Sequence, residues 1–267
     1  MIPLHEYLEG PLWPLFAVLL GLIVGSFANV CIHRLPLGSS IVRPPSACPR
    51  CGTPIRAYDN IPLVSYALLL GRCRNCQAPI SPRYPAVETA NGLAYLWLAL
   101  SLGPTPRTAF SMAFFTALLV LGLIDLDHQI LPDAITLPGI GFGVLAALAL
   151  AGWRGAGASL AAAAGGFLVM WAVASVARWH YGEEALGMGD WKMTAMMGAF
   201  LGWQKLLLAM LLGTAAGSLV GGALMLLRGV GGRHRLPLGT FLALGGMAAL
   251  VAGEPILAWY RERFIDF

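Results

Sequence analysis

Two short stretches of the sequence place carboxylates at the ends of long apolar segments. One spans residues 124–133 and contains Asp125, and the other spans residues 187–190 and ends at Asp190. An ionisable residue at membrane depth is costly, so it indicates a functional site. Two aspartates that meet cannot both ionise easily, so one keeps its proton while the other acts as a base. Such a pair could activate water against a peptide bond. The alternative is two solvated loop carboxylates or helix caps.

Two glycines precede the second aspartate, in Gly187-Met188-Gly189-Asp190. A residue without a Cβ atom allows unusual backbone angles and the close approach of another chain. An extended substrate peptide could hydrogen-bond along such a backbone. We therefore expect Gly187 and Gly189 to support catalysis at Asp190.

Two further charged residues lie beside the expected pair. Asp127 is the rival of Asp125 for the first catalytic position, but two residues further along a helix it points elsewhere. Lys192 could pair with a carboxylate or extend to the membrane interface. We expect both residues to have supporting roles.

The pattern C-x-x-C-x-x-P-I occurs twice, and it predicts a metal site. Four thiolates can close a tetrahedral shell around zinc with no open position, which is typical of structural zinc. Two disulfides or four free thiols are the alternatives, and a reducing cytoplasm disfavours disulfides. Cys31 stands apart and is expected to be a packing residue. The four expected ligands are Cys48, Cys51, Cys73 and Cys76.

The composition indicates a polytopic membrane protein. Of 267 residues, 58% are hydrophobic and 11% charged, whereas soluble domains carry about 25% charged residues. The mean hydropathy is +0.73. The net charge is +4, but the arginines follow the loops between apolar segments, so a nucleic-acid partner is not expected.

Eight apolar segments predict an all-α fold of about eight transmembrane helices with a small zinc-knuckle loop. Residues 33–85 form one polar insert with seven arginines, which the positive-inside rule places in the cytoplasm. Counting crossings from there puts Asp125, Asp127 and Asp190 at the cytoplasmic face. We expect a first helix (1–32), a cysteine domain (33–85) and a seven-helix membrane domain (86–267). The segments are 11–32, 87–102, 108–124, 134–151, 158–177, 191–202, 206–227 and 238–258.

Taken together, these motifs resemble those of the bacterial type IV prepilin peptidases, a family of GxGD aspartyl proteases. The resemblance rests on Gly25–Pro36, the two cysteine pairs, Asn60–Tyr66, Ile80–Glu88, Ile124–Asp133 and Gly187–Asp190. It covers nearly the whole chain, and its motifs are several, ordered and specific.

The resemblance implies a bifunctional enzyme of the bacterial inner membrane. Such an enzyme removes the leader of prepilins or type II secretion pseudopilins at the cytoplasmic face. It then methylates the new N-terminus with S-adenosylmethionine. The family's catalytic aspartates fall on Asp125 and Asp190, and membrane lipids would surround the helices.

The methyltransferase site is less readily identified. The sequence has no strand, glycine-rich loop and helix of the kind that holds a nucleoside cofactor. Polar residues near the cysteine loop are candidates, namely Asn29, His33, Asn60 and Glu88. The first-turn position expected for Glu88, where an acidic residue favours the helix dipole, would explain it without catalysis.

Two other functions stay open on the residues alone. In a membrane transporter the aspartates would relay protons or ions, although acids nearer the bilayer centre would then be expected. In a transferase, Asp125 and Asp127 would hold magnesium on a lipid phosphate.

Overall fold

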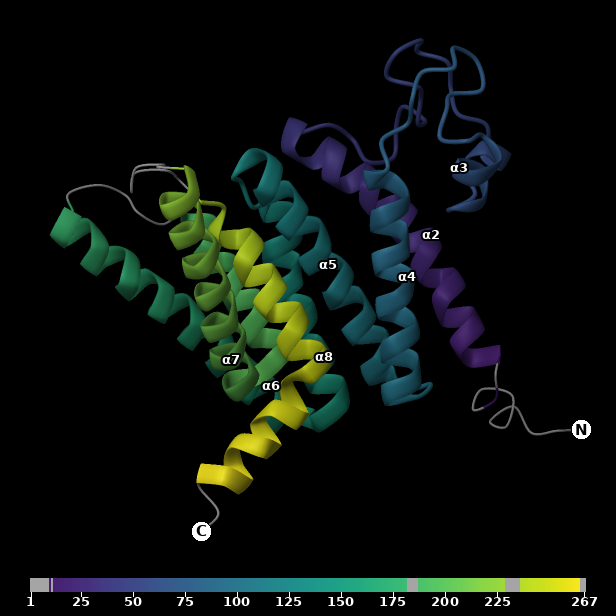
Figure 1. Cartoon of the computed structure of the whole chain (residues 1–267). Helices are drawn as coiled ribbons and strands as arrows, with labels where there is room; N and C mark the ends of the chain where they lie inside the picture. Colours follow the sequence, from purple (N-terminus) through teal and green to yellow (C-terminus); the bar gives the residue numbers. More distant parts are fainter. Residues whose placement is uncertain (1–9, 11, 182–186, 229–235, 265–267) are drawn as a thin grey trace, which may run out of the picture. The chain divides into compact units, whose positions relative to one another are not determined.

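The computed structural model describes residue 10 and residues 12–181, 187–228 and 236–264, and over these it is built from helices (Figure 1). In the described ranges, β structure is limited to two isolated bridges in the cysteine loop. The predicted all-α class is therefore confirmed. The helices, in chain order, are α2 (Leu12–Arg34), η1 (Leu35–Leu37), η2 (Ala57–Asp59), α3 (Val64–Leu68), α4 (Arg83–Leu102), α5 (Pro106–His128), α6 (Asp133–Tyr181), α7 (Met188–Arg228) and α8 (Leu238–Phe264).

The chain forms two compact units, Met1–Thr116 and Ala117–Phe267, and the boundary falls inside α5. The first unit contains the first helix, the cysteine loop and α4. Its central contact joins α2 to α4, where a methyl group on Gly21 would lie 2.8 Å from the Gly92 Cα. Glycines on both helices let the two backbones approach this closely.

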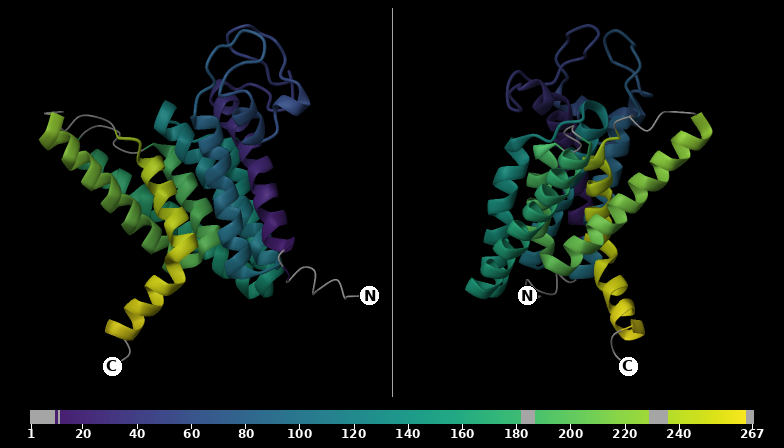
Figure 2. Two further views of the ribbon diagram at one scale, coloured as in Figure 1. Left: turned by 45° about the vertical axis from the view of Figure 1, so that its right-hand side comes forward. Right: turned by 90° about the vertical axis from the view of Figure 1, so that its left-hand side faces the viewer.

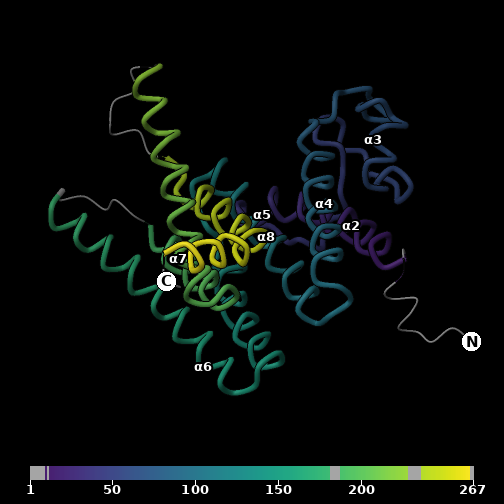
Figure 3. Tube along the Cα trace, turned by 60° about the horizontal axis from the view of Figure 1, so that its bottom comes forward, coloured from purple at the N-terminus to yellow at the C-terminus, as the bar shows by residue number. Residues whose placement is uncertain are grey.

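In the second unit, α6 is two helices joined by a reversal at Gly152. This residue has φ 64° and ψ −160°, a conformation that favours glycine. Both halves reach Ala199: the hydroxyl of Ser159 donates to its carbonyl at 2.7 Å, and a methyl on Gly143 would lie 2.7 Å from its Cβ. A straight helix would hold Gly143 and Ser159 about 24 Å apart. The halves therefore run back along each other, as Figure 3 shows.

Helix α7 reverses in the same way at Gly202, which has φ 71°. A methyl on Gly166 would lie 3.0 Å both from the carbonyl oxygen of Thr194 and from the Leu206 side chain. In a straight helix these two residues would be about 18 Å apart. The reversals bring the starts of α7 and α8 back to the end of the unit where α5 ends and α6 begins (Figure 2).

Two glycines of α7, Gly213 and Gly217, pack against α8 inside this unit. A methyl on Gly213 would lie 2.7 Å from the backbone carbonyl of Phe241 in α8, and one on Gly217 would lie 3.3 Å from the Phe241 ring. These glycines let two helices of the same chain approach closely.

Five described helices are long and apolar enough to cross a membrane: α2 with η1, α5, α6, α7 and α8. The reversals at Gly152 and Gly202 fall at the breaks expected between four of the apolar segments, so α6 and α7 each supply two of the eight. Separate crossings by these halves remain a prediction. Helix α4 falls outside the five because Glu88 and Asn91 make its first half polar.

Candidate active site

Asp125 lies near the end of α5 with its carboxylate at the start of α8. It is buried, and one of its oxygens accepts the backbone N–H of Thr240 at 2.7 Å and the Thr240 hydroxyl at 3.2 Å. The first N–H groups of a helix have no partner within the helix and attract anions. The N-terminus of α8 thus stabilises a carboxylate supplied by another helix.

Asp190 is buried in the first turn of α7. Its carboxylate accepts the backbone N–H of Gly187 at 3.2 Å, and its own N–H donates to the Gly187 carbonyl at 3.1 Å. This reciprocal pair resembles half of a capping box, in which an acidic side chain reaches back to the helix start. Asp190 therefore caps its own helix, and this local role is compatible with chemistry at the same carboxylate.

The two aspartates lie near each other. One side chain, Leu131, lies beside both helix starts. A methyl on Gly189 would come 2.9 Å from the Leu131 Cβ, and one on Gly239 would come 3.0 Å from Leu131 Cδ1 and from the Asp125 carboxyl carbon. Two buried carboxylates thus share one end of the second unit.

The glycines of the second motif differ in what surrounds them. Gly189 has no room for a side chain because Leu131 covers it, whereas a methyl on Gly187 would make only an ordinary contact of 3.6 Å with Asp190. Packing therefore explains the glycine at 189. At Gly187, which is exposed, packing leaves room for a side chain.

The supporting residues lie around this pair. Asp127 is exposed, while Asp125 is buried. Lys192 donates to both carboxylate oxygens of Asp133 at 2.8 Å, so its ion pair ties α7 to the start of α6. Of the two roles considered for Lys192, pairing with a carboxylate is the one observed, and the partner is Asp133.

The two cysteine pairs fold into knuckles with the same hydrogen bonds. In the first, the N–H of Cys48 donates to the Thr53 carbonyl at 2.9 Å. In the second, the N–H of Cys73 donates to the Ala78 carbonyl at 2.9 Å. One residue after each pair has a left-handed conformation, Gly52 with φ 70° and Gln77 with φ 57°. The repeated sequence is thus a repeated structure.

The four paired cysteines are gathered so that they could bind a metal ion. Their sulfur atoms all lie within 4.8 Å of one another, and those of Cys48 and Cys76 are 3.8 Å apart. A tetrahedral site with metal–sulfur distances of about 2.3 Å places its sulfurs about 3.8 Å apart. Cys31 is buried away from them, as expected.

Hydrogen bonds around Cys51 favour the thiolate that a metal requires. Bonds with the side chain and backbone of Thr53, and then with the side chain of Asn75, lower the pKa of Cys51 to about 6. A deprotonated thiol is the form that ligates metal. Asn75 of the second knuckle thus hydrogen-bonds to Cys51, an expected ligand in the first.

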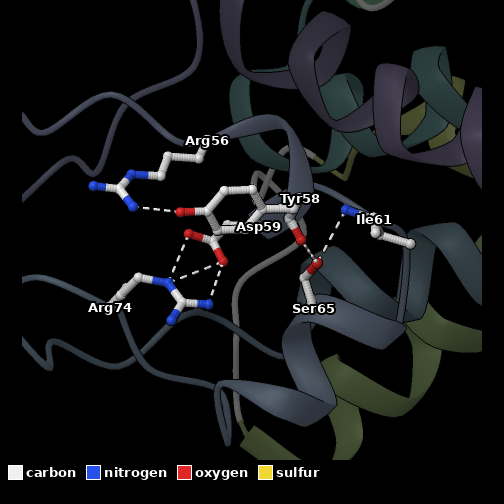
Figure 4. A network of polar contacts seen from close by, with 6 residues as sticks. All are labelled: Arg56, Tyr58, Asp59, Ile61, Ser65 and Arg74. Atoms are coloured by element: carbon white, nitrogen blue, oxygen red, sulfur yellow. Dashed lines mark hydrogen bonds and ion pairs between the residues drawn. The ribbon is translucent and has the colours of Figure 1, made fainter.

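A polar network joins the second knuckle to η2 (Figure 4). Arg74 makes a forked pair with Asp59, with contacts of 2.6 to 3.1 Å. The guanidinium groups of Arg74 and Arg56 lie over the Tyr58 ring, at 5.6 and 5.8 Å from its centre. The hydrogen bonds from Arg74 lower the pKa of Asp59. This network holds the loop together outside the metal site.

The polar candidates near the cysteine loop separate into two groups. Glu88 is buried and accepts the backbone N–H of Leu63 at 2.9 Å. Its expected first-turn position was wrong, because α4 begins at Arg83 and has no acidic residue in its first turn. Asn29 is also buried and donates to the Tyr84 carbonyl at 3.1 Å. His33 and Asn60 are exposed.

Sequence reasoning missed two residues of the site, Thr240 and Leu131. Thr240 carried a usable signal: it is the third residue after Pro237, where an apolar segment begins, and the first N–H groups of a helix need an acceptor. Leu131 carried no such signal in the sequence, because an apolar residue in a short loop is common.

Comparisons with known proteins identify the family of the chain. The family model for the bacterial peptidase A24 N-terminal domain matches residues 19–102, and that for the type IV leader peptidase family matches residues 112–222. No solved structure matches significantly.

Three relatives are each named prepilin leader peptidase/N-methyltransferase. That of Aeromonas hydrophila is 38% identical over 99% of this chain and 100% of its own, and that of Pseudomonas aeruginosa is 39% identical over 98% of both. That of Myxococcus xanthus is 44% identical over 85% of this chain and 69% of its own. The chain therefore belongs to the type IV leader peptidase family.

Proposed function

We propose that the protein is a membrane-embedded aspartyl endopeptidase with a second, methyl-transferring activity. It removes the leader of type IV prepilins or type II secretion pseudopilins and then N-methylates the new N-terminal residue. The observation that carries the peptidase proposal is the pair of buried carboxylates, Asp125 and Asp190, at one end of the second unit. The names of the full-length relatives support both activities.

In the peptidase reaction, Asp125 serves as the charged partner. The backbone N–H of Thr240 and its hydroxyl, which is shared with the Gly122 carbonyl, stabilise the Asp125 carboxylate, whereas the bond described for Asp190 comes from one backbone N–H. Asp190 therefore holds the shared proton. Asp125 takes a proton from water as the water oxygen attacks the scissile carbonyl carbon, and Asp190 gives its proton to the carbonyl oxygen. When the C–N bond breaks, Asp125 gives its proton to the leaving nitrogen, and Asp190 takes a proton back from a hydroxyl of the tetrahedral intermediate as the new carboxyl group forms.

The site lies where helices end, which suits a substrate that crosses the membrane interface. A prepilin carries a basic leader followed by an apolar segment, so the apolar part lies among helices while water still reaches the scissile bond. The arginine-rich loop is cytoplasmic by the positive-inside rule, and chain crossings counted from it put the dyad on that side. We propose a multi-pass inner-membrane protein whose active site faces the cytoplasm.

In this proposal, a structural zinc ion would be held by the four clustered cysteines, Cys48, Cys51, Cys73 and Cys76. A shell of four thiolates leaves no open position for water or substrate, so the ion would stabilise the loop and take no part in peptide hydrolysis.

The methyl-transfer step uses S-adenosylmethionine as donor and needs the new amine uncharged and in line with the sulfonium. The buried side chains of Asn29 and Glu88 near the cysteine loop are candidates for holding that amine.

The decisive experiment compares cleavage of a model prepilin in membranes by the wild type and by Asp125→Asn, Asp127→Asn and Asp190→Asn. Loss of cleavage at 125 and 190, with survival at 127, is expected. Loss at 127 with survival at 125 would move the first catalytic position by two residues. Full activity in all three would overturn the protease proposal and favour a transporter, which proton or ion flux in vesicles would then test. Cleavage that persists in excess magnesium chelator excludes the metal-dependent transferase.

A further inference from the structure

Helix α3 of the cysteine loop buries a polar side chain and exposes apolar ones, which is the reverse of what is usual for a segment in water. Its polar residue, Ser65, is buried, donates to the Tyr58 carbonyl at 2.9 Å and accepts the Ile61 N–H at 3.0 Å. Val64 and Leu68 are 51% and 78% exposed. A short helix in water normally turns its apolar side chains inward. An inverted arrangement indicates that something apolar covers the outer face.

Leu70, just after the helix, is also exposed. It has φ 50° and is 84% exposed. A left-handed backbone costs free energy for any residue with a Cβ, and glycine or asparagine avoids most of that cost. Exposure of a leucine side chain to water does not offset this cost. Insertion of the side chain into an apolar phase would offset it.

Helix α3 begins beside helices α2 and α4 of its own unit. The N–H of Leu63, at the start of α3, donates to the carboxylate of Glu88 in α4. At that level, a methyl on Gly25 of α2 would lie 2.8 Å from the Glu88 Cα. Gly25 is about 13 Å along the axis from Arg34 at the end of α2. Helix α3 thus folds back from the knuckles to the level of a membrane-spanning segment.

The basic charge of the loop indicates that this apolar phase is an anionic bilayer. Residues 33–85 contain seven arginines against one acidic residue, Asp59. Arg72, two residues after Leu70, is exposed. Basic residues beside an apolar face are the composition of segments that lie on anionic bilayers, with the apolar side chains among the upper acyl chains and the charges at the headgroups.

We propose that α3 and Leu70 form an interfacial anchor, which inserts Val64, Leu68 and Leu70 into the surface of an anionic bilayer. The anchor fixes the metal-binding knuckles above the headgroups at the ends of α2 and α4. This proposal is independent of the cleavage chemistry and holds or fails without it.

The test is photo-crosslinking of the full-length protein in nanodiscs of phosphatidylglycerol and phosphatidylcholine. The photoreactive residue p-benzoyl-phenylalanine replaces Leu68, Leu70 or, as the control, the exposed Arg50 of the first knuckle. Each variant is first compared with the wild type for helical content and thermal unfolding, so that only folded protein is compared. After irradiation, mass spectrometry identifies what each position has captured.

Lipid adducts at 68 and 70, several-fold more abundant than at 50, are the expected result. Adducts to residues 117–267 would overturn the proposal, because the face would then be an internal contact of the chain. Adducts to an added prepilin in place of lipid would assign the face to the substrate. Equal lipid labelling at 50, or no adduct at 68 and 70, would show that α3 is not an anchor.

Discussion

The side chain of Leu131 lies against the α-carbon of Gly189, so closely that a methyl group on Gly189 would come 2.9 Å from the Leu131 Cβ. Leu131 follows the helix that carries Asp125, and Gly189 precedes Asp190. The contact therefore links the two segments that supply the aspartates. Its closeness gives a physical reason for one of the two glycines in the Gly-x-Gly-Asp motif.

This contact predicts a suppressor. Gly189→Ala should destabilise the protein by about 1–3 kcal/mol, the range for overpacking, and should lower prepilin cleavage. Leu131→Gly in the same chain removes the Cβ that the new methyl meets, so the double variant should recover part of both losses. Thermal unfolding and cleavage rates of the four proteins give the coupling, which for residues in contact is about 0.5–3 kcal/mol.

Gly239 is the matched control for that suppressor. A methyl there would meet both Leu131 and the carboxyl group of Asp125, each at 3.0 Å. Leu131→Gly removes only one of these neighbours, because the carboxyl group of Asp125 stays. Gly239→Ala should therefore stay impaired in the double variant. Equal rescue at both glycines would contradict a specific contact between Leu131 and Gly189.

The hydroxyl of Thr240 should matter for catalysis because it donates to the Asp125 carboxylate. Thr240→Val keeps the shape and the backbone N–H but removes this hydroxyl. We expect a loss of about 1 kcal/mol of stabilisation, or roughly a fivefold lower kcat for prepilin cleavage, with KM little changed.

Thr240→Ser is the control, because it keeps the hydroxyl and should keep most of the rate. The hydroxyl also lies 2.9 Å from the Gly122 carbonyl, so unfolding temperatures must be compared alongside the rates. A serine variant as slow as the valine variant would show that the rate depends on packing at this position and not specifically on the hydroxyl.

Short-range patterns predicted much of the structure. The repeated C-x-x-C-x-x-P-I became two knuckles with matching hydrogen bonds, because that geometry is local. Gly152 and Gly202 lie at the breaks between apolar segments, where hydropathy falls and a glycine can take a positive φ. The clustering of Asp125 and Asp190 followed from counting reversals of direction.

The contacts that complete the site depend on the register of one helix against another. Whether α8 presents Thr240 or a neighbour to Asp125 changes with a shift of one residue, and no local pattern fixes that shift. The bond from Leu63 to Glu88 spans 25 residues and joins a loop to a helix. The first-turn role expected for Glu88 failed because α4 starts earlier, at Arg83.

The two knuckles allow a pair of substitutions with opposite effects. Gly52 has φ 70° and nothing within 4 Å of a Cβ placed on it, so Gly52→Ala adds only backbone strain. It should weaken the folded loop by about 1 kcal/mol, and zinc affinity by roughly fivefold. Gln77 has φ 57° in the equivalent position. Gln77→Gly removes this strain and should strengthen zinc binding by up to about fivefold. The larger conformational entropy that glycine loses on folding reduces this gain.

Competition with a zinc chelator on the purified protein measures both knuckle variants. Stripping the metal should also expose the cysteines to thiol reagents while the helical content of the protein remains. Changes of the same sign in the two variants would contradict the equivalence of Gly52 and Gln77. Failure of the wild type to bind zinc would overturn the metal assignment.

The forked pair of Arg74 with Asp59 predicts how the loop responds to acid. Hydrogen bonds from Arg74 hold the pKa of Asp59 below its ordinary value in the folded protein, and that value is about 3.9 in the unfolded chain. A carboxyl group with a lowered folded pKa stabilises the fold above the unfolded pKa and loses this contribution as the pH falls through the folded pKa. Asp59→Asn should therefore unfold more readily than the wild type at pH 5–8, by a constant amount. The difference should shrink below about pH 4.

Proteolysis of the loop at a series of pH values measures this difference in stability, and Arg74→Gln should give the same pH dependence. A difference that grew toward low pH would mean that the pKa of Asp59 is raised on folding, and the pair would then not stabilise the loop.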